Sequence, residues 1–297
     1  MKEVIIIFGG SSVEKEISAQ SADGIFKNID QSKFSPKLID IEDLKINTLT
    51  KDIVIFIAVH GEGGEDGTIQ KLLSDNKIKF TGSGEKSARL CWDKISSKSL
   101  MQSNAIPTPA YRIVRKDEKI ELKDDFYKSI ESFFVKPNSN GSSFGVSKVA
   151  DINLLEKAVA EARIYSDDVI IEEAYNVAEY TVGVLKGEAL EPLEIIADDD
   201  QGFYNYEAKY NSKKTKKVEV VDESLKKELQ KIALKAFYQH GCQTWGRVDF
   251  VFNGDQLGVL EINTVPGFTE NSLFPLAAKI SGINYQELIT NIIEDSI

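Results

Sequence analysis

The chain has few residues of the kinds that form disulfide frameworks and metal centres. Its 297 residues include only two cysteines and two histidines. Cys91 and Cys242 lie far apart in the sequence, so we predict neither a disulfide scaffold nor a zinc site, and we interpret both as structural thiols. His240 stands directly before Gly241, an arrangement typical of a helix C-terminus, where a histidine interacts with the last carbonyls and the helix dipole.

The chain also lacks an excess of positive charge and any long apolar run. It has 36 basic and 47 acidic residues and a net charge of -11, which argues against a nucleic-acid or anionic membrane surface. Any phosphate chemistry must therefore use local positive charge. The apolar segment Met1–Phe8 is too short for a signal peptide or a membrane span. We expect a cytoplasmic protein without nucleic-acid or membrane partners.

Strand and helix patterns alternate from the first residues onward. Buried strands are indicated at 4–8, 37–41 and 52–60, and helical spacing of apolar residues at 12–29. This rhythm predicts a small doubly wound α/β domain that ends near Thr81–Gly82.

The remainder divides into two further units. A helix at 92–103 stops before "AIPTPAY", whose prolines force extended backbone. The next unit has predicted strands at 112–114, 133–136, 146–149 and 169–171 and a helix at 153–163, and the last unit has a hairpin, a helix at 224–240 and a closing helix. We predict domains at 1–83, 84–172 and 173–297.

The stretch "WGRVDFVFNGDQLGVLEINTVPGFT" (245–269) reads as a hairpin with a turn at Asn253–Gly254. Side chains alternate along strands, so a loop with an odd number of residues places Asp249 opposite Glu261, and Arg247 opposite Asn263. Facing carboxylates destabilise a sheet, and removing one should stabilise the metal-free protein. Their oxygens and that of Asn263 suit Mg²⁺ or Mn²⁺, so we predict Mg-nucleotide as the positive partner.

A second stretch, "FFVKPNSNGSSFGVSK" (133–148), is suited to phosphate. Lys136 ends an apolar strand, and the following Ser, Asn and Gly residues offer N–H groups and hydroxyls to a polyphosphate. The order of a Walker A loop is absent. A strand-end lysine alone is more often solvated, but Lys94, Lys209 and Arg247 have similar apolar neighbours, which strengthens the interpretation.

Two glycine-rich loops follow predicted strands, "GGSSVEKE" (9–16) and "HGEGGEDGT" (60–68). Neither fits a dinucleotide fingerprint, and their acidic residues favour a cationic ligand such as an amine. Glu14 is also spaced as the capping-box partner of Ser11, and His60 fits a hydrogen-bonded turn residue. These alternatives stay open at this point.

Taken together, several motifs resemble the D-alanine–D-alanine ligases of the ATP-grasp superfamily along nearly the whole chain. They are "FGGSSVEKEIS", "HGEGGEDGTIQ", "TGSG", "WDKISSK", "IPTPAY", "VKPNSNGSSFGVSKV", "FYNYEAKY", "WGRVDF" and "LEINTVPGFTENSL". The resemblance implies an ATP-grasp fold of three α/β domains, with the nucleotide held between the central and carboxy-terminal domains. It also implies ATP-dependent ligation of two D-alanines through an acyl phosphate, for peptidoglycan precursor synthesis, by a homodimer.

The resemblance implies a role for each matched residue. Catalytic roles fall to Glu14, Ser142, Tyr210, Arg247 and Gly267; substrate binding to His60, Ser272 and Leu273; nucleotide binding to Lys94, Lys136, Glu172, Glu173, Tyr175, Glu179 and Lys209; and binding of two Mg²⁺ or Mn²⁺ ions to Asp249, Glu261 and Asn263. It further implies that Tyr210 favours an amine over a hydroxyl nucleophile. We also predict that 201–217 forms a lid over the phosphates.

Some positions depart from the family pattern, and two rival functions remain. Val265, Glu173 and Asn271 replace a frequent serine, lysine and histidine of the family. The rivals are another ATP-grasp carboxylate–amine ligase, and a non-catalytic nucleotide-sensing module. The sensing module has no reason to keep three metal ligands together with Arg247.

Overall fold

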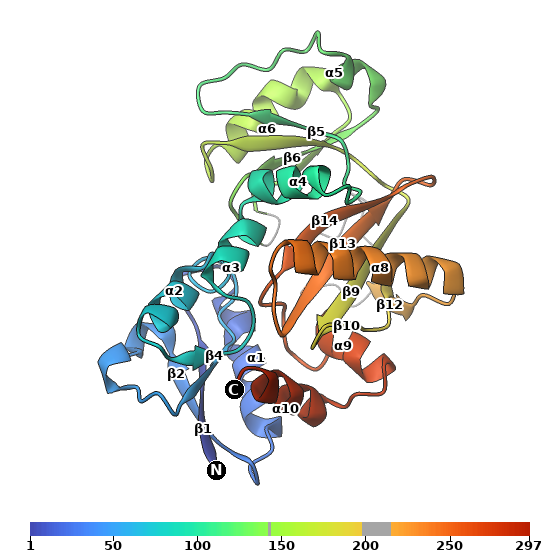
Figure 1. Cartoon of the computed structure of the whole chain (residues 1–297). Coiled ribbons are helices and arrows are strands. Elements are labelled where there is room, and N and C mark those ends of the chain that lie inside the picture. The colour runs from blue at the N-terminus through green and yellow to red at the C-terminus, as the bar shows by residue number, and fades with distance from the viewer. Residues whose placement is uncertain (142–143, 198–214) are drawn as a thin grey trace.

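The computed structural model describes residues 1–141, 144–197 and 215–297. Ser142, Lys209, Tyr210 and most of the predicted lid at 201–217 lie outside the described residues. The described chain forms three sheets, which appear in Figure 1 as a blue amino-terminal unit, a green unit at the top and an orange carboxy-terminal unit.

The amino-terminal sheet is parallel, with the strand order β2-β1-β3-β4. Its elements are β1 (Lys2–Phe8), α1 (Lys15–Asn28), β2 (Phe34–Asp40), the short helices η1 (Ile41–Asp43) and η2 (Ile46–Thr48), β3 (Val54–Ile57), α2 (Thr68–Asp75) and β4 (Lys79–Phe80). Strand β1 is central and apolar, as a parallel strand covered on both faces must be. The predicted strands and helix are present, but Val13 is not a core residue, since it precedes α1 and is 60% exposed.

The middle sheet is antiparallel, with the order β5-β8-β6-β7. It consists of β5 (Tyr111–Val114), α5 (Asp125–Ser129), β6 (Phe133–Pro137), β7 (Ser147–Val149), η3 (Ile152–Leu154), α6 (Leu155–Ala162) and β8 (Val169–Glu173). Its side chains form a separate apolar cluster drawn from residues 114–171.

The carboxy-terminal sheet is antiparallel, with the order β12-β11-β9-β13-β14 and β10 paired to β9. It consists of β9 (Ala178–Leu185), β10 (Glu188–Ala189), β11 (Leu193–Ile196), β12 (Lys216–Glu219), β13 (Trp245–Phe252) and β14 (Leu257–Asn263), and its helices are α8 (Glu223–Gln239), α9 (Leu273–Ile280) and α10 (Tyr285–Asp295). The first sheet lies within 1–83, and β8 runs one residue past 172. The domain boundaries themselves stay predictions.

His240 ends α8, as predicted, but without a charge. Its Nδ1 donates to the Ala236 carbonyl (2.8 Å), and its Nε2 accepts from the Ser97 hydroxyl (2.9 Å). Burial lowers the pKa of His240, so the ring is neutral. The predicted interaction with the last carbonyls is therefore confirmed, although the neutral ring brings no charge to the helix dipole.

The predicted helix at 92–103 is α4 (Lys94–Ser103), which begins two residues later than expected, and the helix before it, α3 (Glu85–Trp92), was not predicted. They separate at Asp93, whose extended backbone ends α3 and whose side chain accepts from the Ser96 N–H to cap α4.

The two cysteines are distant in sequence but touch in the structure. Cys91 on α3 and Cys242 after α8 are buried free thiols with their sulfur atoms 3.7 Å apart. The contact with Cys242 and burial raise the pKa of the Cys91 thiol well above its ordinary value. Both thiols belong to the core of the carboxy-terminal sheet. Because the Cys91 thiol stays protonated, its role is packing in this core rather than chemical reactivity.

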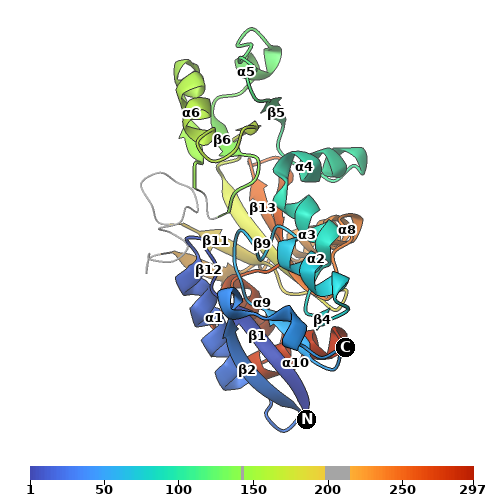
Figure 2. The ribbon, with the colours of Figure 1, turned by 90° about the vertical axis from the view of Figure 1, so that its left-hand side faces the viewer.

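The final helices join the amino-terminal unit to the carboxy-terminal unit. Side chains of α9 and α10 share one apolar cluster with β1, β3 and α1, and α10 lies beside α1 in Figures 1 and 2. No helix among the described residues is long and apolar enough to cross a membrane.

The hairpin has the predicted pairing, but for a different reason. Asp249 faces Glu261, and Arg247 faces Asn263. The loop between the strands spans 253–256, an even number of residues, and a β-bulge at Leu260 supplies the extra residue that the pairing requires.

Candidate active site

Two cavities meet where the three sheets come together. The larger, about 300 Å³, lies between α1, the loop after β3 and the segment after β14; the smaller, about 100 Å³, lies between the middle and carboxy-terminal sheets. Lys94, Asn140, Gly141 and Glu261 line both. A ligand in one cavity is therefore within reach of a ligand in the other.

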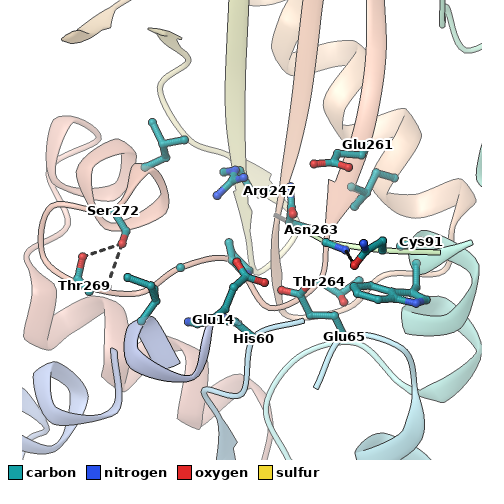
Figure 3. A pocket seen from close by; sticks show the side chains of 18 of the residues that line it. Glu14, His60, Glu65, Cys91, Arg247, Glu261, Asn263, Thr264, Thr269 and Ser272 are labelled. Carbon is teal, nitrogen blue, oxygen red and sulfur yellow. Dashed lines mark hydrogen bonds between the residues drawn. The ribbon is translucent and has the colours of Figure 1, made fainter. Parts of the chain in front are cut away.

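Glu14 stands at the amino-terminal side of the larger cavity (Figure 3). The residue is 8% exposed and is itself the N-cap position of α1, since the helix begins at Lys15. Ser11 therefore does not cap this helix, and the capping-box interpretation of Glu14 is wrong. A buried carboxylate that lines a cavity is suited to hold an ammonium group.

Glu65 was quoted in the glycine-rich motif but given no role, and it lies close to Glu14. It lines the larger cavity, where Figure 3 shows it beside His60 and Glu14. Burial and the negative charges of Glu14 and Glu261 raise the pKa of Glu65 well above its ordinary value. This side of the cavity favours cations, as the acidity of its motif predicted.

His60 is 3% exposed and is held at both ring nitrogens. Its Nδ1 lies 3.0 Å from the Val265 carbonyl, and its Nε2 lies 3.0 Å from the Ser21 hydroxyl. Burial lowers the pKa of His60, so the ring is neutral, with the proton on the nitrogen that faces the carbonyl. The interpretation as a hydrogen-bonded residue thus agrees with the structure, and His60 also lines the cavity.

The hairpin carboxylates face the junction of the cavities, and Asp249 already has a positive partner. Arg247 reaches it with two hydrogen bonds of 2.8 Å, and Thr181 (2.6 Å) and Asn263 (2.9 Å) also donate to it. The expectation that Mg-nucleotide is the positive partner of Asp249 and Glu261 was therefore incomplete. The side chain of Arg247 extends along its own strand and pairs with Asp249, which lies two positions away on the same face. For Asp249, the repulsion argument does not hold.

The donor set of this cluster fits a hard divalent cation. Asp249 and Glu261 are opposite one another on neighbouring strands, and Asn263 contacts Asp249. All three offer oxygen atoms, the ligands that Mg²⁺ and Mn²⁺ prefer. They would hold such an ion at the junction, with the remaining positions left to phosphate oxygens.

The smaller cavity contains a buried cluster with one more positive than negative charge. Glu172 is 1% exposed and is contacted by Lys136 at 2.7 Å and by Lys98 at 2.6 Å. Burial alone would raise the pKa of Glu172, but the two lysines outweigh it and lower this pKa. The excess charge is suited to an anionic ligand.

Lys98 was part of the motif "WDKISSK" but was not predicted as a site residue. It is 2% exposed, and burial lowers its pKa despite the attraction of Glu172. It also donates to the Thr108 hydroxyl (2.7 Å), which donates to the Val259 carbonyl. The signal was its helical spacing from Lys94, four positions earlier, but a lysine on a predicted helix is usually solvated.

Lys94 reaches the shared wall because the start of α4 is fixed to the end of β6. The Asn138 amide group accepts from the Ile95 N–H (2.8 Å) and donates to Asp93 (2.8 Å). The Lys94 ammonium donates to the Asn140 carbonyl (2.7 Å). This arrangement aims a cation at the junction of the two cavities.

The segment after β14 forms the other side of the larger cavity. Gly267, Ser272 and Leu273 line it. The Ser272 hydroxyl bonds Thr269 (2.8 Å to its hydroxyl, 3.0 Å from its N–H) rather than capping α9. The first N–H groups of α9 have no partner within the helix, so they are suited to bind a carboxylate.

Every described residue of the predicted site except Glu173 lines one of the two cavities. Glu173 follows Glu172 in β8 and so points to the other face of the sheet, where burial raises its pKa. Residues separated by more than 200 positions in the sequence, such as His60 and Val265, therefore lie together at the site, as the motifs predicted.

Comparisons with known proteins agree with this geometry. The family model described as "D-ala D-ala ligase C-terminus" matches residues 100–294. The chain is 36% identical to the D-alanine–D-alanine ligase of Methylacidiphilum infernorum and 35% identical to that of Alcanivorax borkumensis. These matches cover 99% of this chain and 95% and 94% of the relatives. The chain belongs to the D-alanine–D-alanine ligase family.

Solved structures of D-alanine–D-alanine ligases and related ligases have the same ATP-grasp fold. The Bacillus anthracis D-alanine–D-alanine ligase complexed with ATP superimposes with a TM-score of 0.86 at 29% identity, covering 100% of this chain and 97% of that one. The VanG D-Ala:D-Ser ligase of Enterococcus faecalis gives 0.88 at 27% identity, covering 100% and 99%.

Proposed function

We propose that the protein joins two D-alanine molecules to D-alanyl-D-alanine with ATP, releasing ADP and phosphate, for peptidoglycan precursor synthesis. The observation that carries this proposal is the shared wall of the two cavities. It brings the cavity that contains the Lys98–Glu172–Lys136 cluster next to a cavity that has an acidic end and a helix N-terminus.

In this proposal the first D-alanine binds with its ammonium at Glu14 and its carboxylate toward Lys94. A carboxylate oxygen attacks the γ-phosphorus of ATP, forming an O–P bond as the bond to ADP breaks. Lys94 and Lys136 hold the phosphates, and Glu172 holds Lys136 by their 2.7 Å contact. A bound Mg²⁺ or Mn²⁺ pair at Asp249, Glu261 and Asn263 would neutralise the charge of the phosphates.

The second D-alanine binds with its carboxylate at Ser272 and the first N–H groups of α9. Its neutral amine attacks the acyl phosphate carbon, and the electron pair moves to the carbonyl oxygen. Arg247 and the Gly267 N–H, which line the same cavity, stabilise this oxyanion. Collapse breaks the C–O bond and expels phosphate, which takes up the proton that the nitrogen loses.

In this proposal the adenine and ribose contact Glu172, Tyr175 and Glu179, which line the smaller cavity. Because the Glu172 carboxylate is occupied by two lysines, its contribution there is to position them. Glu173 contributes through its backbone, whose N–H already bonds the Ala110 carbonyl.

The decisive experiment is phosphate release with ATP and Mg²⁺ across D- and L-amino acids, with dipeptides identified by mass spectrometry. We expect D-alanine alone to support turnover, and loss of turnover with EDTA. Turnover with L-amino acids only would identify another carboxylate–amine ligase, and ATP binding without turnover would identify a sensing module.

D-Serine and D-lactate belong in the same panel as second substrates. The likeness to the VanG D-Ala:D-Ser ligase makes D-serine a specific competitor. We propose D-alanine as the preferred second substrate and, from Tyr210, an amine rather than a hydroxyl nucleophile. The proposal also includes a cytoplasmic homodimer, which light scattering coupled to gel filtration tests.

A further inference from the structure

The segment between β14 and α9 carries Gly267 between two anchored residues. Val265 is 3% exposed and Phe268 is 1% exposed, and Phe268 packs against the rings of Phe56, Trp245 and Tyr285. Only Pro266 and Gly267 lie between the anchors. Since the proline ring fixes one backbone dihedral, few rotations remain to change the direction of the Gly267 N–H.

Both anchors are hydrogen-bonded to the amino-terminal unit. The Ser21 hydroxyl accepts from the Phe268 N–H (3.2 Å) and donates to Nε2 of His60 (3.0 Å). His60 in turn donates from Nδ1 to the Val265 carbonyl (3.0 Å). With these donors and acceptors, each polar atom in this series of hydrogen bonds has a partner, because a carbonyl only accepts and the neutral ring has one donor.

Ser21 lies on α1, whose N-cap position is Glu14. The two residues are seven positions apart, which places them on the same helix face, toward the carboxy-terminal unit. Ser18, on the same helix, instead bonds within the amino-terminal unit: its hydroxyl donates to the Ala58 carbonyl (2.7 Å) and accepts from the Gly9 N–H (2.9 Å). Helix α1 is thus fixed to its own sheet by Ser18 and to the Gly267 segment by Ser21.

We propose that Ser21 is a positioning residue of the ligation reaction, which acts with His60 to direct the Gly267 N–H at the developing oxyanion. The inference rests on the proposed function. The oxyanion donor is then held by the helix that also presents Glu14 to the first substrate. Tyr285 on α10, whose hydroxyl donates to the Phe268 carbonyl, fixes the same residue from the other side.

The test compares Ser21→Ala with Ser18→Ala, the same change on the same helix. Loss of an oxyanion donor costs about 10²- to 10³-fold in kcat, and a misdirected donor costs less. For Ser21→Ala we expect kcat to fall about tenfold while KM for ATP changes less than about twofold. A phosphinate analogue of the tetrahedral intermediate should lose a similar factor in affinity. Ser18→Ala should lower the melting temperature by a similar amount without this loss of kcat and analogue affinity.

A second variant and a double mutant separate the outcomes. Ser21→Cys nearly keeps the volume of the side chain but offers a weaker donor, so it replaces Ser21→Ala if that variant does not fold. For Ser21→Cys we expect a several-fold fall in kcat. His60→Gln and the Ser21→Ala/His60→Gln double mutant should lose similar amounts, because both residues act through one segment. Wild-type kcat in the folded Ser21 variants, an equal loss in Ser18→Ala, or additive losses in the double mutant would overturn the inference. Absence of D-alanine turnover in the wild type would instead overturn the proposed function.

Discussion

Asp249 and Glu261 face one another, yet their surroundings differ at the scale of single residues. The carboxylate of Asp249 accepts four hydrogen bonds, from Thr181, Asn263 and twice from Arg247. Among the described residues, no hydrogen bond or ion pair joins the Glu261 carboxylate. The same conservative substitution should therefore have different effects on stability at the two positions.

We predict that Asp249→Asn destabilises the metal-free protein by about 1–3 kcal/mol, because an amide presents an NH₂ group to donors and removes the negative charge that Arg247 contacts. Glu261→Gln should change stability by less than about 0.5 kcal/mol. Both should abolish most turnover. Thermal melts in EDTA test the stabilities, and a melting temperature for Asp249→Asn at or above the wild type would contradict the role of Arg247.

Because of its two buried histidines, we expect the protein to lose stability in mild acid. Burial lowers the pKa of both His60 and His240 below 6.5 in the folded protein. As the pH falls through 6.5, the unfolded chain binds protons that the folded chain does not, so stability present above this pH is lost below it. Each such proton contributes up to about 1.36 kcal/mol per pH unit. Urea unfolding at several pH values between about 5 and 7.5 measures the slope.

His240→Gln is the matched variant for this slope. Glutamine has one donor and one acceptor group but does not titrate, so the variant should be less stable near pH 7.5 and should lose less stability on acidification than the wild type. Equal slopes would show that His240 does not contribute to the acid sensitivity.

Several residues of the site could not be predicted because their roles depend on partners distant in sequence. Glu14, Asp249 and Gly267 carry motif signals that a single chain displays. Ser21 and Lys98 are ordinary residues on predicted helices, and their importance appears only when the ring of residue 60 and the N–H of residue 268, or a carboxylate of residue 172, lie beside them. Burial, which periodicity alone does not quantify, separates them from solvated neighbours.

At the scale of elements, the β14 bulge shapes the smaller cavity. A bulge brings two consecutive side chains to the same side of a strand, and both Leu260 and Glu261 line the smaller cavity with Asp249. The sequence predicts the pairing of Asp249 with Glu261, which we assigned to an odd number of residues in the loop. A bulge has no residue signature here, because Leu260 fits a regular strand equally well.

We predict that deletion of Leu260 leaves the hairpin folded, because Phe250 and Asp249 then pair with Val259 and Glu261 in a regular ladder. The cavity loses an apolar wall, so KM for ATP should rise about tenfold with a smaller change in KM for D-alanine. Leu260→Ala is the control and should raise KM for ATP less. A deletion variant with wild-type KM for ATP would show that the bulge does not shape this site.

At the scale of the whole molecule, the apolar clusters do not follow chain order. The middle sheet has its own cluster, whereas the amino-terminal sheet shares one with α9 and α10. Alternating patterns predicted each sheet, but they do not state which buried faces meet. The carboxy-terminal helices therefore close both the core of the amino-terminal unit and the segment that carries Gly267.

This arrangement predicts one cooperative unit that joins the first and last predicted domains and a second that lies within the middle domain. Ile292 on α10 and Ile171 on β8 are both 0% exposed, and truncation of such a residue costs about 2–5 kcal/mol. Hydrogen exchange read by mass spectrometry should show that Ile292→Ala lowers protection of β1 and α9 together while β8 keeps its protection. Ile171→Ala should do the reverse, because its contacts lie within the middle sheet. If Ile292→Ala weakened only α10, the amino-terminal sheet would be stable without the carboxy-terminal helices, and helix α1 could not depend on them to keep Ser21 against the Gly267 segment.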